Sequence, residues 1–305
     1  MWPAAPRTPG SGSASVPFPA CWRQIVWLKT FRAVLSTTTE QPRPGKCLRV
    51  ARLGQGQAVV LLHGYPDNLQ VFSALAPELA RHKQVVAFDW PGMGSSDEWP
   101  GGATPLLMAK RLRELLDTWQ LDKVHLVGQD MGGQPALVFA AQYPERVRSV
   151  VVMNSLVNGA AATSWEIRWL RRFGANKLLL RHLPWLVFGR AMRTFTPGGT
   201  RLSPALRQDL WGAFRRPAVR DFIVRMCAGY EGQLKRLPEW YGQVQCPVLL
   251  LWAEHDKHFP VLQAESLRAF IPQARVQVVP GAGHWMVLTR AAEVADHLRR
   301  FYQEL

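Results

Sequence analysis

The sequence predicts an α/β protein with a doubly wound, mostly parallel sheet and an inserted helical lid. Six near-continuous apolar runs have the length of strands, and such runs are typical of parallel strands that helices cover on both faces. Helical patterns separate the runs, and this alternation favours right-handed crossovers within one sheet. The alternation stops between Asn154 and Val244, where Arg, Trp and Leu recur at helical spacing, so this segment is predicted to form the lid.

The apolar runs place the six strands at Ala58–Leu62, Val85–Phe88, Val124–Val127, Val150–Met153, Val248–Trp252 and Val276–Val279. The helices of the core are expected at Leu69–Lys83, Pro105–Trp119, Gln134–Tyr143, Val261–Ile271 and Ala291–Glu304.

The chain divides into three parts by composition. Residues 1–45 are rich in Pro, Ser, Gly and Thr and carry no acid before Glu40, which is typical of a partly flexible tail. Residues 46–156 and 241–305 form the predicted core, and residues 157–240 the predicted lid. A lid of this kind excludes water and shapes the substrate site.

The net charge of +15 raises the question of a nucleic-acid partner. Most of the excess lies in the lid, where Val157 to Trp240 hold 15 Lys and Arg against 5 Asp and Glu. These cations form no compact motif and a coherent enzyme pattern competes with them, so nucleic acid is not the expected partner. Acidic substrates or acidic surfaces remain alternatives.

The remaining composition points to a cytoplasmic protein without a membrane span. No run of about 18 or more uninterrupted apolar residues, the length that a membrane helix needs, is present. Four cysteines are scattered without C-x-x-C spacing, which predicts neither a disulfide framework nor a zinc site and fits a reducing compartment. No metal or cofactor is expected.

The stretch from Val124 to Gly133 is predicted to be a strand that turns sharply into a helix. Glycines 128, 132 and 133 supply the small side chains that such a crossing needs. The residue at the apex is Asp130, in the position that the nucleophile occupies in a Gly-x-Ser-x-Gly elbow. Asp130 is therefore a candidate nucleophile, and the alternative is that it only caps the following helix.

Polar and ionisable residues follow several of the predicted strands. Ligands of open parallel sheets bind at the carboxyl ends of the strands, so chemistry is expected where each apolar run stops. His63-Gly64-Tyr65-Pro66 follows the first run, and Asp89 to Asp97 follow the second. Glu254-His255-Asp256 follow the fifth run, and Gly283-His284-Trp285 the sixth.

In the order of these motifs, residues 48–305 resemble the α/β-hydrolase superfamily. The resemblance rests on His-Gly-x-Pro, Gly-x-Gly-x-Ser, the elbow, a late acid and a last histidine. It implies a triad of Asp130 as nucleophile, Asp256 as acid and His284 as base, with the backbone amides of Tyr65 and Met131 as the oxyanion hole. Glu254 and Asp97 compete for the role of the acid, and His255 and His258 for that of the base. His63 is expected to be structural, and neither Ser95 nor Ser155 sits on an elbow.

An aspartate at the apex resembles the branch of epoxide hydrolases and haloalkane dehalogenases. In that branch the carboxylate attacks a saturated carbon of a small apolar or amphipathic substrate, and His284 would then activate water against the resulting ester. Met131 and Tyr65 stand where dehalogenase donors to the halide would be expected, which favours an epoxide over a halide. A ligand-binding protein without catalysis is a further alternative.

An epoxide opening also needs a group that assists the leaving oxygen. The resemblance points to lid tyrosines, here Tyr230 and Tyr241, although Phe222 stands where one of the family's tyrosines would be expected. Trp285, next to His284, is a third candidate for contact with the leaving group or substrate.

Overall fold

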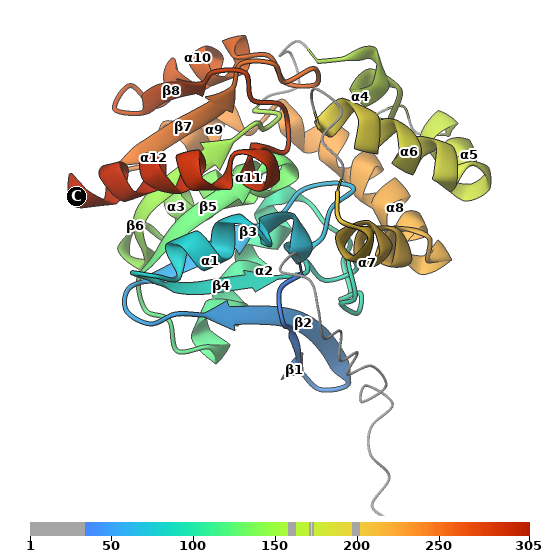
Figure 1. Cartoon of the computed structure of the whole chain (residues 1–305), viewed down its shortest axis with the longest axis horizontal. Coiled ribbons are helices and arrows are strands. Elements are labelled where there is room, and N and C mark those ends of the chain that lie inside the picture. Colours follow the sequence, from blue (N-terminus) through green and yellow to red (C-terminus); the bar gives the residue numbers. More distant parts are fainter. Residues whose placement is uncertain (1–33, 158–162, 171, 173, 197–201) are drawn as a thin grey trace, which may run out of the picture.

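The computed structural model describes residues 34–157, 163–170, 172, 174–196 and 202–305, and Figure 1 shows their arrangement. The centre is an eight-stranded sheet with the strand order β1-β2-β4-β3-β5-β6-β7-β8. Strands β3 to β8 run parallel, whereas β2 is antiparallel to both β1 and β4. The predicted α/β class with a mostly parallel sheet is confirmed.

All six predicted strands are present, as β3 (Ala58–Leu62), β4 (Gln84–Phe88), β5 (Val124–Gln129), β6 (Val147–Met153), β7 (Val248–Ala253) and β8 (Arg275–Val279). Strands β3, β5 and β7 are buried throughout, as their apolar runs predict. β8 differs, because it forms the edge of the sheet and three of its five residues are exposed.

Two further strands, β1 (Thr38–Arg43) and β2 (Lys46–Leu53), form a hairpin. β1 lies inside the segment 1–45 that the composition assigns to the tail. The sequence signal was the Pro44-Gly45 turn, where Gly45 adopts a φ of 64° that glycine accommodates without strain.

Helices connect the strands on both sides of the sheet (Figure 1). They are α2 (Pro105–Thr118), α3 (Gly133–Gln142), α10 (Leu262–Arg268), α11 (Met286–Thr289) and α12 (Ala291–Gln303), with short 3₁₀ turns at Asp130–Gly132 and Pro144–Arg146. Helix α2 begins where the Thr104 hydroxyl accepts the Leu107 amide and Pro105 takes the first position.

The single helix predicted over Leu69–Lys83 is divided into a 3₁₀ helix (Leu69–Phe72) and α1 (Leu75–Leu79). Pro77 explains the break, because it lacks the amide hydrogen that would continue the hydrogen-bond ladder back toward Ser73.

Between β6 and β7 the chain forms the inserted helical region that the sequence predicts. It comprises α4 (Trp165–Leu170), α5 (Ala175–His182), α6 (Pro184–Phe195), α7 (Pro204–Phe214) and α8 (Pro217–Leu234), and α9 (Pro238–Tyr241) leads back to the sheet. Three of the lid helices begin with proline, which is favoured at the first position of a helix and ends the one before it. These helices gather at one side of the molecule (Figure 1).

A largely buried charged contact between β2 and α7 fastens this lid to the core. The Arg49 guanidinium on β2 donates to both carboxylate oxygens of Asp209 on α7, at 2.9 and 2.7 Å. The Asn68 amide donates to the same carboxylate at 2.8 Å, and Arg49 lies 3.7 Å from the buried Asp89. Because both sides of the Arg49–Asp209 pair are mostly shielded from water, this contact is stronger than an exposed ion pair.

Two expectations from the composition can be compared with the structure. The expectation from cysteine spacing is wrong for Cys47, which is disulfide-bonded, whereas Cys227 and Cys246 are free. In the described part of the chain, no helix has both the length and the apolar character that a membrane span requires.

The Asp209→Ala variant tests whether the Arg49 contact holds the lid. Loss of a bidentate hydrogen bond to a charged group is expected to lower the free energy of unfolding by about 2 kcal/mol, measured by urea denaturation. Glu239→Ala is the matched control, because Glu239 forms an exposed lid pair with Arg236, and a change within about 0.5 kcal/mol is expected there. Equal effects of the two variants would contradict a special role for Arg49.

Candidate active site

Asp130 stands at the apex of the predicted turn between β5 and α3. Its φ of 52° is uncommon for a residue with a side chain, and it turns the carboxylate away from the sheet. The turn requires glycine where backbones meet, since a Cβ on Gly132 would lie 2.0 Å from the Leu62 carbonyl oxygen. A Cβ on Gly64 would lie 2.3 Å from the Asp130 Cβ, so glycine there lets the loop after β3 approach the apex.

The two oxygens of the Asp130 carboxylate have different surroundings. Oδ1 accepts the backbone amide of Tyr65 at 3.1 Å and that of Met131. Oδ2 lies 3.3 Å from Nε2 of His284. The carboxylate is thus oriented by two fixed N–H groups on one side and an imidazole on the other, and these are the amides that the sequence analysis assigned to an oxyanion hole.

Asp256 holds the other side of His284. Its Oδ2 lies 2.7 Å from His284 Nδ1, and its Oδ1 accepts the backbone amides of His258 and Phe259 at 2.8 and 3.0 Å. The competing acids lie elsewhere: Glu254 accepts the Gly281 amide and Asp97 accepts the Cys47 amide. The structure therefore brings Asp130, His284 and Asp256 together in one line of contacts.

Two residues that the sequence analysis did not single out fix the histidine loop. The side-chain amides of Gln129 and Asn154 both donate to the His284 carbonyl oxygen at 2.8 Å. The Asn154 oxygen in turn accepts the Ala253 amide at 2.8 Å, which ties the ends of β6 and β7 together. Both residues follow apolar strand runs. A polar residue at the carboxyl end of a buried strand was therefore the signal in the sequence that could have identified them.

The two carboxylates control the charge of His284. Burial alone disfavours the imidazolium, but Asp256 and Asp130 outweigh burial and raise the pKa of His284 from 6.5 to about 10. The imidazole is therefore protonated at neutral pH while Asp130 is a free carboxylate.

Other histidines have structural contacts. The His63 ring bonds the Gly64 carbonyl oxygen at 2.8 Å and accepts the Trp90 amide at 3.0 Å, so its predicted role in pinning the loop is confirmed. His258 lies 2.8 and 2.9 Å from the hydroxyls of Thr194 and Ser164, and burial lowers its pKa to about 4. The Ser155 hydroxyl donates to the Asp130 carbonyl oxygen at 2.6 Å.

Asp67 is a buried acid beside the triad. Its Oδ2 accepts the Trp285 indole N–H at 3.2 Å, and its Oδ1 has no hydrogen-bond partner among the described residues. Burial, together with the negative charge of Asp130, raises the pKa of Asp67 to about 8. The indole of Trp285 is thus occupied by Asp67, and the structure does not direct it at a substrate.

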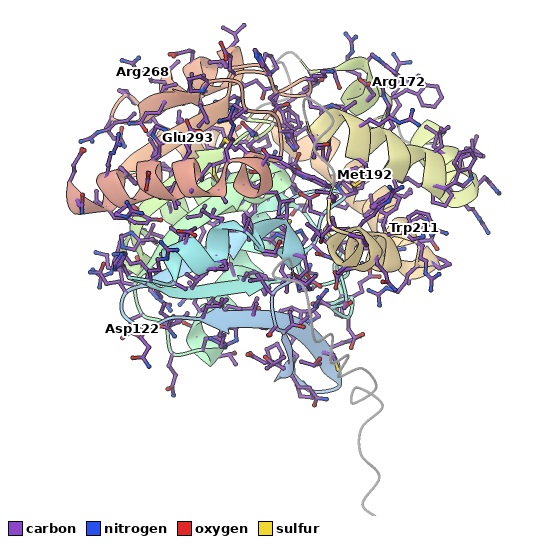
Figure 2. The ribbon with its side chains drawn as sticks, viewed as in Figure 1. Asp122, Arg172, Met192, Trp211, Arg268 and Glu293 are labelled. Atoms are coloured by element: carbon purple, nitrogen blue, oxygen red, sulfur yellow. The ribbon has the colours of Figure 1, made fainter. Side chains whose placement is uncertain are left out.

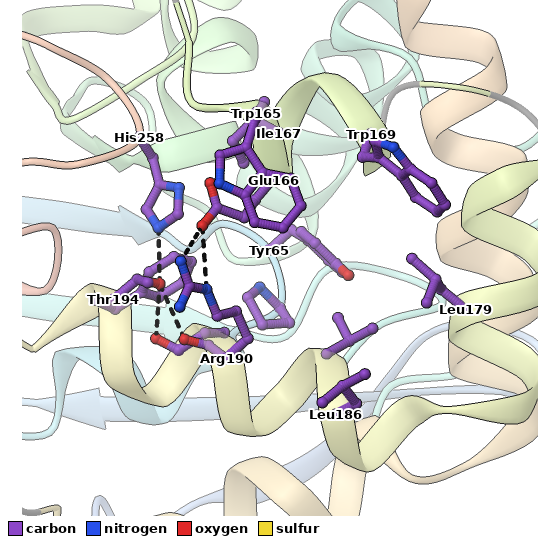
Figure 3. A pocket seen from close by; sticks show the side chains of 14 residues that line it. Tyr65, Trp165, Glu166, Ile167, Trp169, Leu179, Leu186, Arg190, Thr194 and His258 are labelled. Carbon is purple, nitrogen blue, oxygen red and sulfur yellow. Dashed lines mark hydrogen bonds and ion pairs between the residues drawn. The ribbon is translucent and has the colours of Figure 1, made fainter.

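A cavity of about 280 Å³ lies between the oxyanion loop and the lid (Figure 3). Its walls come from the loop residues Tyr65 and Pro66, from His258, and from α4, α5 and α6. Most of the lining is apolar, with an ion pair between Arg190 and Glu166 at 2.6 Å. Within the described residues, no group of three or more His, Cys, Asp or Glu is arranged to hold a metal ion.

The cavity adjoins the triad. The Phe195 ring lines the cavity and lies 4.4 Å from the His284 ring, centroid to centroid. Tyr65 lines it as well, while its amide contacts Asp130. Figure 3 shows the Tyr65 hydroxyl directed into the cavity toward Leu179. Asp130 and His284 do not line the cavity themselves; Tyr65 and Phe195 lie between them and it.

The lid tyrosines named from the sequence do not lie in this cavity as far as the structure describes them. The Tyr241 hydroxyl is buried and donates to the Val157 carbonyl oxygen at 2.7 Å, and Tyr241 is absent from the cavity wall. Tyr230 belongs to α8, but its side chain lies outside the described residues. Phe222 is buried in the same helix, next to Gly92.

A family model for the alpha/beta hydrolase fold matches residues 57–291. The chain belongs to this family. The match begins after β1 and β2 and covers β3 to β8, so it includes the elbow, Asp256 and His284.

Proteins similar to this chain in sequence include a 2-hydroxy-6-oxo-6-phenylhexa-2,4-dienoate hydrolase from Burkholderia cepacia. It is 27% identical over 248 residues, which cover 76% of this chain and 82% of that protein. A poly(3-hydroxyalkanoate) depolymerase from Ectopseudomonas oleovorans is 26% identical over 257 residues, covering 81% and 84%.

Among solved structures, the epoxide hydrolase CorEH aligns with a TM-score of 0.75 at 19% identity, over 88% of this chain and 99% of that chain. At this identity the likeness shows the fold alone. Fold, family and relatives together identify the chain as an α/β-fold hydrolase.

The Asp130→Asn variant is expected to lower the pKa of His284, because one of the two carboxylates that raise it is removed. NMR titration of the ring should place the wild-type pKa near 10 and the variant's below it. Since the folded pKa exceeds 6.5, the stability that His284 contributes is fully present below pH 6.5 and is lost as pH rises through about 10; the variant should lose it at lower pH. An unchanged pKa of His284 in the variant would show that the Asp130 carboxylate does not influence the charge of that ring.

Proposed function

We propose that the protein is a hydrolase that forms an alkyl ester on Asp130 by opening an epoxide, and that water then hydrolyses the ester. One observation carries the proposal: the apex carboxylate has one oxygen on the Tyr65 and Met131 amides and the other 3.3 Å from His284. A carboxylate is ionised at neutral pH and needs no base to attack carbon.

The choice of an aspartate argues for a saturated carbon over an acyl carbon. Attack by a carboxylate on a saturated carbon gives an ester, which is stable enough to be an intermediate. Attack on an acyl carbon would give an anhydride, which lies higher in free energy than an ester or ketone substrate, so its formation is unfavourable. A substrate like that named for the Burkholderia cepacia relative is therefore the weaker candidate, despite 27% identity.

The protonation of His284 fits two half-reactions. While Asp130 is charged, its carboxylate helps to hold the proton on His284. Esterification removes that charge, so the pKa of His284 falls and the ring can release its proton and act as base. Water that loses a proton to Nε2 attacks the ester carbonyl, while the Tyr65 and Met131 amides stabilise the oxyanion on Oδ1.

The surroundings of Asp130 favour an epoxide over a halide. A departing halide needs N–H donors, but the residue after the nucleophile is Met131 and the Trp285 indole already donates to Asp67. An epoxide oxygen leaves as an alkoxide, which needs a proton donor instead.

The Tyr65 hydroxyl is the proton donor that we assign to this step. It is buried and has no hydrogen-bond partner among the described residues, although its ring lines the cavity. A buried hydroxyl left unpaired costs about 1 to 3 kcal/mol, a cost that a bound substrate oxygen would remove. Burial raises the pKa of Tyr65 well above its usual range, and Cys227 and Asp130 act in the same direction, so the phenol keeps its proton until an alkoxide forms.

The protons balance over one turnover. Asp130 Oδ2 bonds to the epoxide carbon, the carbon–oxygen bond breaks, and the oxygen takes the Tyr65 proton. After the ester forms, the proton that His284 releases passes through solvent to the Tyr65 phenolate and restores the phenol. In the second half-reaction neutral His284 takes a proton from water as the hydroxide attacks the ester carbonyl, and the other proton of that water goes to the departing alkoxide. Asp130 is then again a carboxylate and His284 is again protonated. The net reaction adds one water to the epoxide and gives a diol.

The His284→Gln variant is expected to accumulate the ester, because alkylation needs only Asp130 whereas hydrolysis needs the base. After mixing with an epoxide panel, mass spectrometry of the intact protein should show the added mass of one substrate, and a proteolytic digest should place it on the peptide that holds Asp130. Asp130→Asn is the control and should show none. A His284→Gln enzyme that turns over normally would remove His284 from the mechanism.

Oxygen-18 water separates this route from direct attack by water on the substrate. In multiple turnovers the ester route transfers label into the Asp130 carboxylate, while direct attack leaves it unlabelled. Parallel panels of epoxides, haloalkanes, esters and the dienoate class identify the leaving group. Turnover without label on Asp130 would overturn the covalent mechanism.

The Tyr65→Phe variant should slow ester formation on epoxides by about a hundredfold, the usual size of one general acid. Rapid-quench mass spectrometry in the His284→Gln background measures that step alone. Tyr241→Phe is the matched control, because its hydroxyl is also buried but donates to the Val157 carbonyl oxygen; it should keep the alkylation rate. Unchanged alkylation in Tyr65→Phe would exclude Tyr65 as the donor and leave the ester on Asp130 intact as a proposal.

A further inference from the structure

The lid exposes an unusual number of large apolar side chains. Of the ten such side chains exposed among the described residues, six lie between residues 165 and 186: Trp165, Trp169, Leu178, Leu183, Trp185 and Leu186. Trp185 is 62% exposed and Leu178 is 65% exposed. We call the exposed side of α4, α5 and α6 the lid face. Exposed apolar groups that gather in this way mark an interaction site more often than a plain water-facing surface.

The lid face is also strongly basic. From Trp165 to Phe195 the chain holds seven Lys and Arg and one acid, Glu166, which pairs with Arg190. Lys177, Arg181 and Arg193 are exposed, and Arg172 lies at the outer edge of the lid (Figure 2). Tryptophan and leucine among cations are the composition of surfaces that lie in the interface of an anionic bilayer.

We propose that the lid face docks on an anionic phospholipid membrane. The charge of the lid face complements a negative bilayer, and its indole rings suit the boundary between headgroups and acyl chains. No described helix is long and apolar enough to cross a membrane, so the contact is peripheral.

The cavity connects this surface with the triad. Trp165, Trp169 and Leu186 are exposed on the lid face and also line the cavity, so the apolar surface continues inward. Figure 3 shows these side chains on the lid side of the cavity, facing Tyr65. An apolar substrate dissolved in the bilayer would meet the cavity mouth without passing through water. This inference does not depend on which bond the enzyme cleaves.

Other occupants of the lid face fit less well. Two copies of this chain would bring their basic lid faces together and repel one another. A nucleic acid would use the cations but leave most of the exposed leucines without a partner.

Sedimentation with vesicles tests the proposal on the full-length protein. Binding is expected to mixed phosphatidylcholine and phosphatidylserine vesicles, to weaken with salt, and to be weaker on phosphatidylcholine alone. Lys177→Gln with Arg181→Gln should lower the partition coefficient by roughly twentyfold, and Trp165→Ala with Trp185→Ala by roughly tenfold. Leu262→Ala with Arg268→Gln, both exposed on α10, is the matched control and should bind as the wild type.

Several results would overturn the proposal. They are an absence of sedimentation, equal losses in the lid variants and the α10 control, or equal binding to neutral and anionic vesicles. Salt-sensitive binding to single-stranded DNA in place of vesicles, or a dimer in size-exclusion chromatography that Trp185→Ala dissociates, would reassign the lid face. Asp130→Asn should bind vesicles like the wild type, so failure of membrane binding and failure of the ester mechanism remain distinguishable.

Discussion

The buried His284 imidazole lies between the carboxylates of Asp256 and Asp130, and the rest of the site is arranged around that contact. A buried charge is costly unless it is paired and hydrogen-bonded, and removing one partner of such a pair costs about 3 to 5 kcal/mol. Here the Asp256 carboxylate accepts hydrogen bonds from two backbone amides, and the Asp130 carboxylate accepts them from two others, which stabilises both charges. The loops after β3, β5, β7 and β8 are therefore coupled through one cluster of charges.

The same cluster gives a reason for the order of steps in the proposed mechanism. A free Asp130 keeps His284 protonated, so the imidazole is not available as a base before the substrate arrives. Only a neutral, esterified Asp130 would release it. In the proposed mechanism the first half-reaction would therefore prepare the base for the second, with no movement of the backbone.

The sheet and the grouping of Asp130, Asp256 and His284 could be predicted because their signals are local in the sequence. Apolar runs mark strands buried on both faces, and the acid at the apex, the late acid and the last histidine each follow such a run. β1 was missed because its residues alternate only weakly and its partner β2 is antiparallel. Gln129 and Asn154 could not be assigned from the sequence, because their role depends on a carbonyl oxygen more than one hundred residues away in the chain.

The lid was the least predictable part, since helical periodicity shows which side chains share a face but not what that face meets. Tyr241 was expected to serve the substrate, yet its hydroxyl bonds the Val157 carbonyl oxygen. The tyrosine that does line the cavity is Tyr65, whose buried hydroxyl has no partner among the described residues and whose amide already holds Asp130. With the amide and the proposed proton donor on one short loop, the reacting atoms would not depend on the position of the lid. The lid helices can then shift together with their exposed Trp and Leu side chains and leave the reacting groups in place. A lid that supplied the catalytic acid would displace that acid whenever it moved.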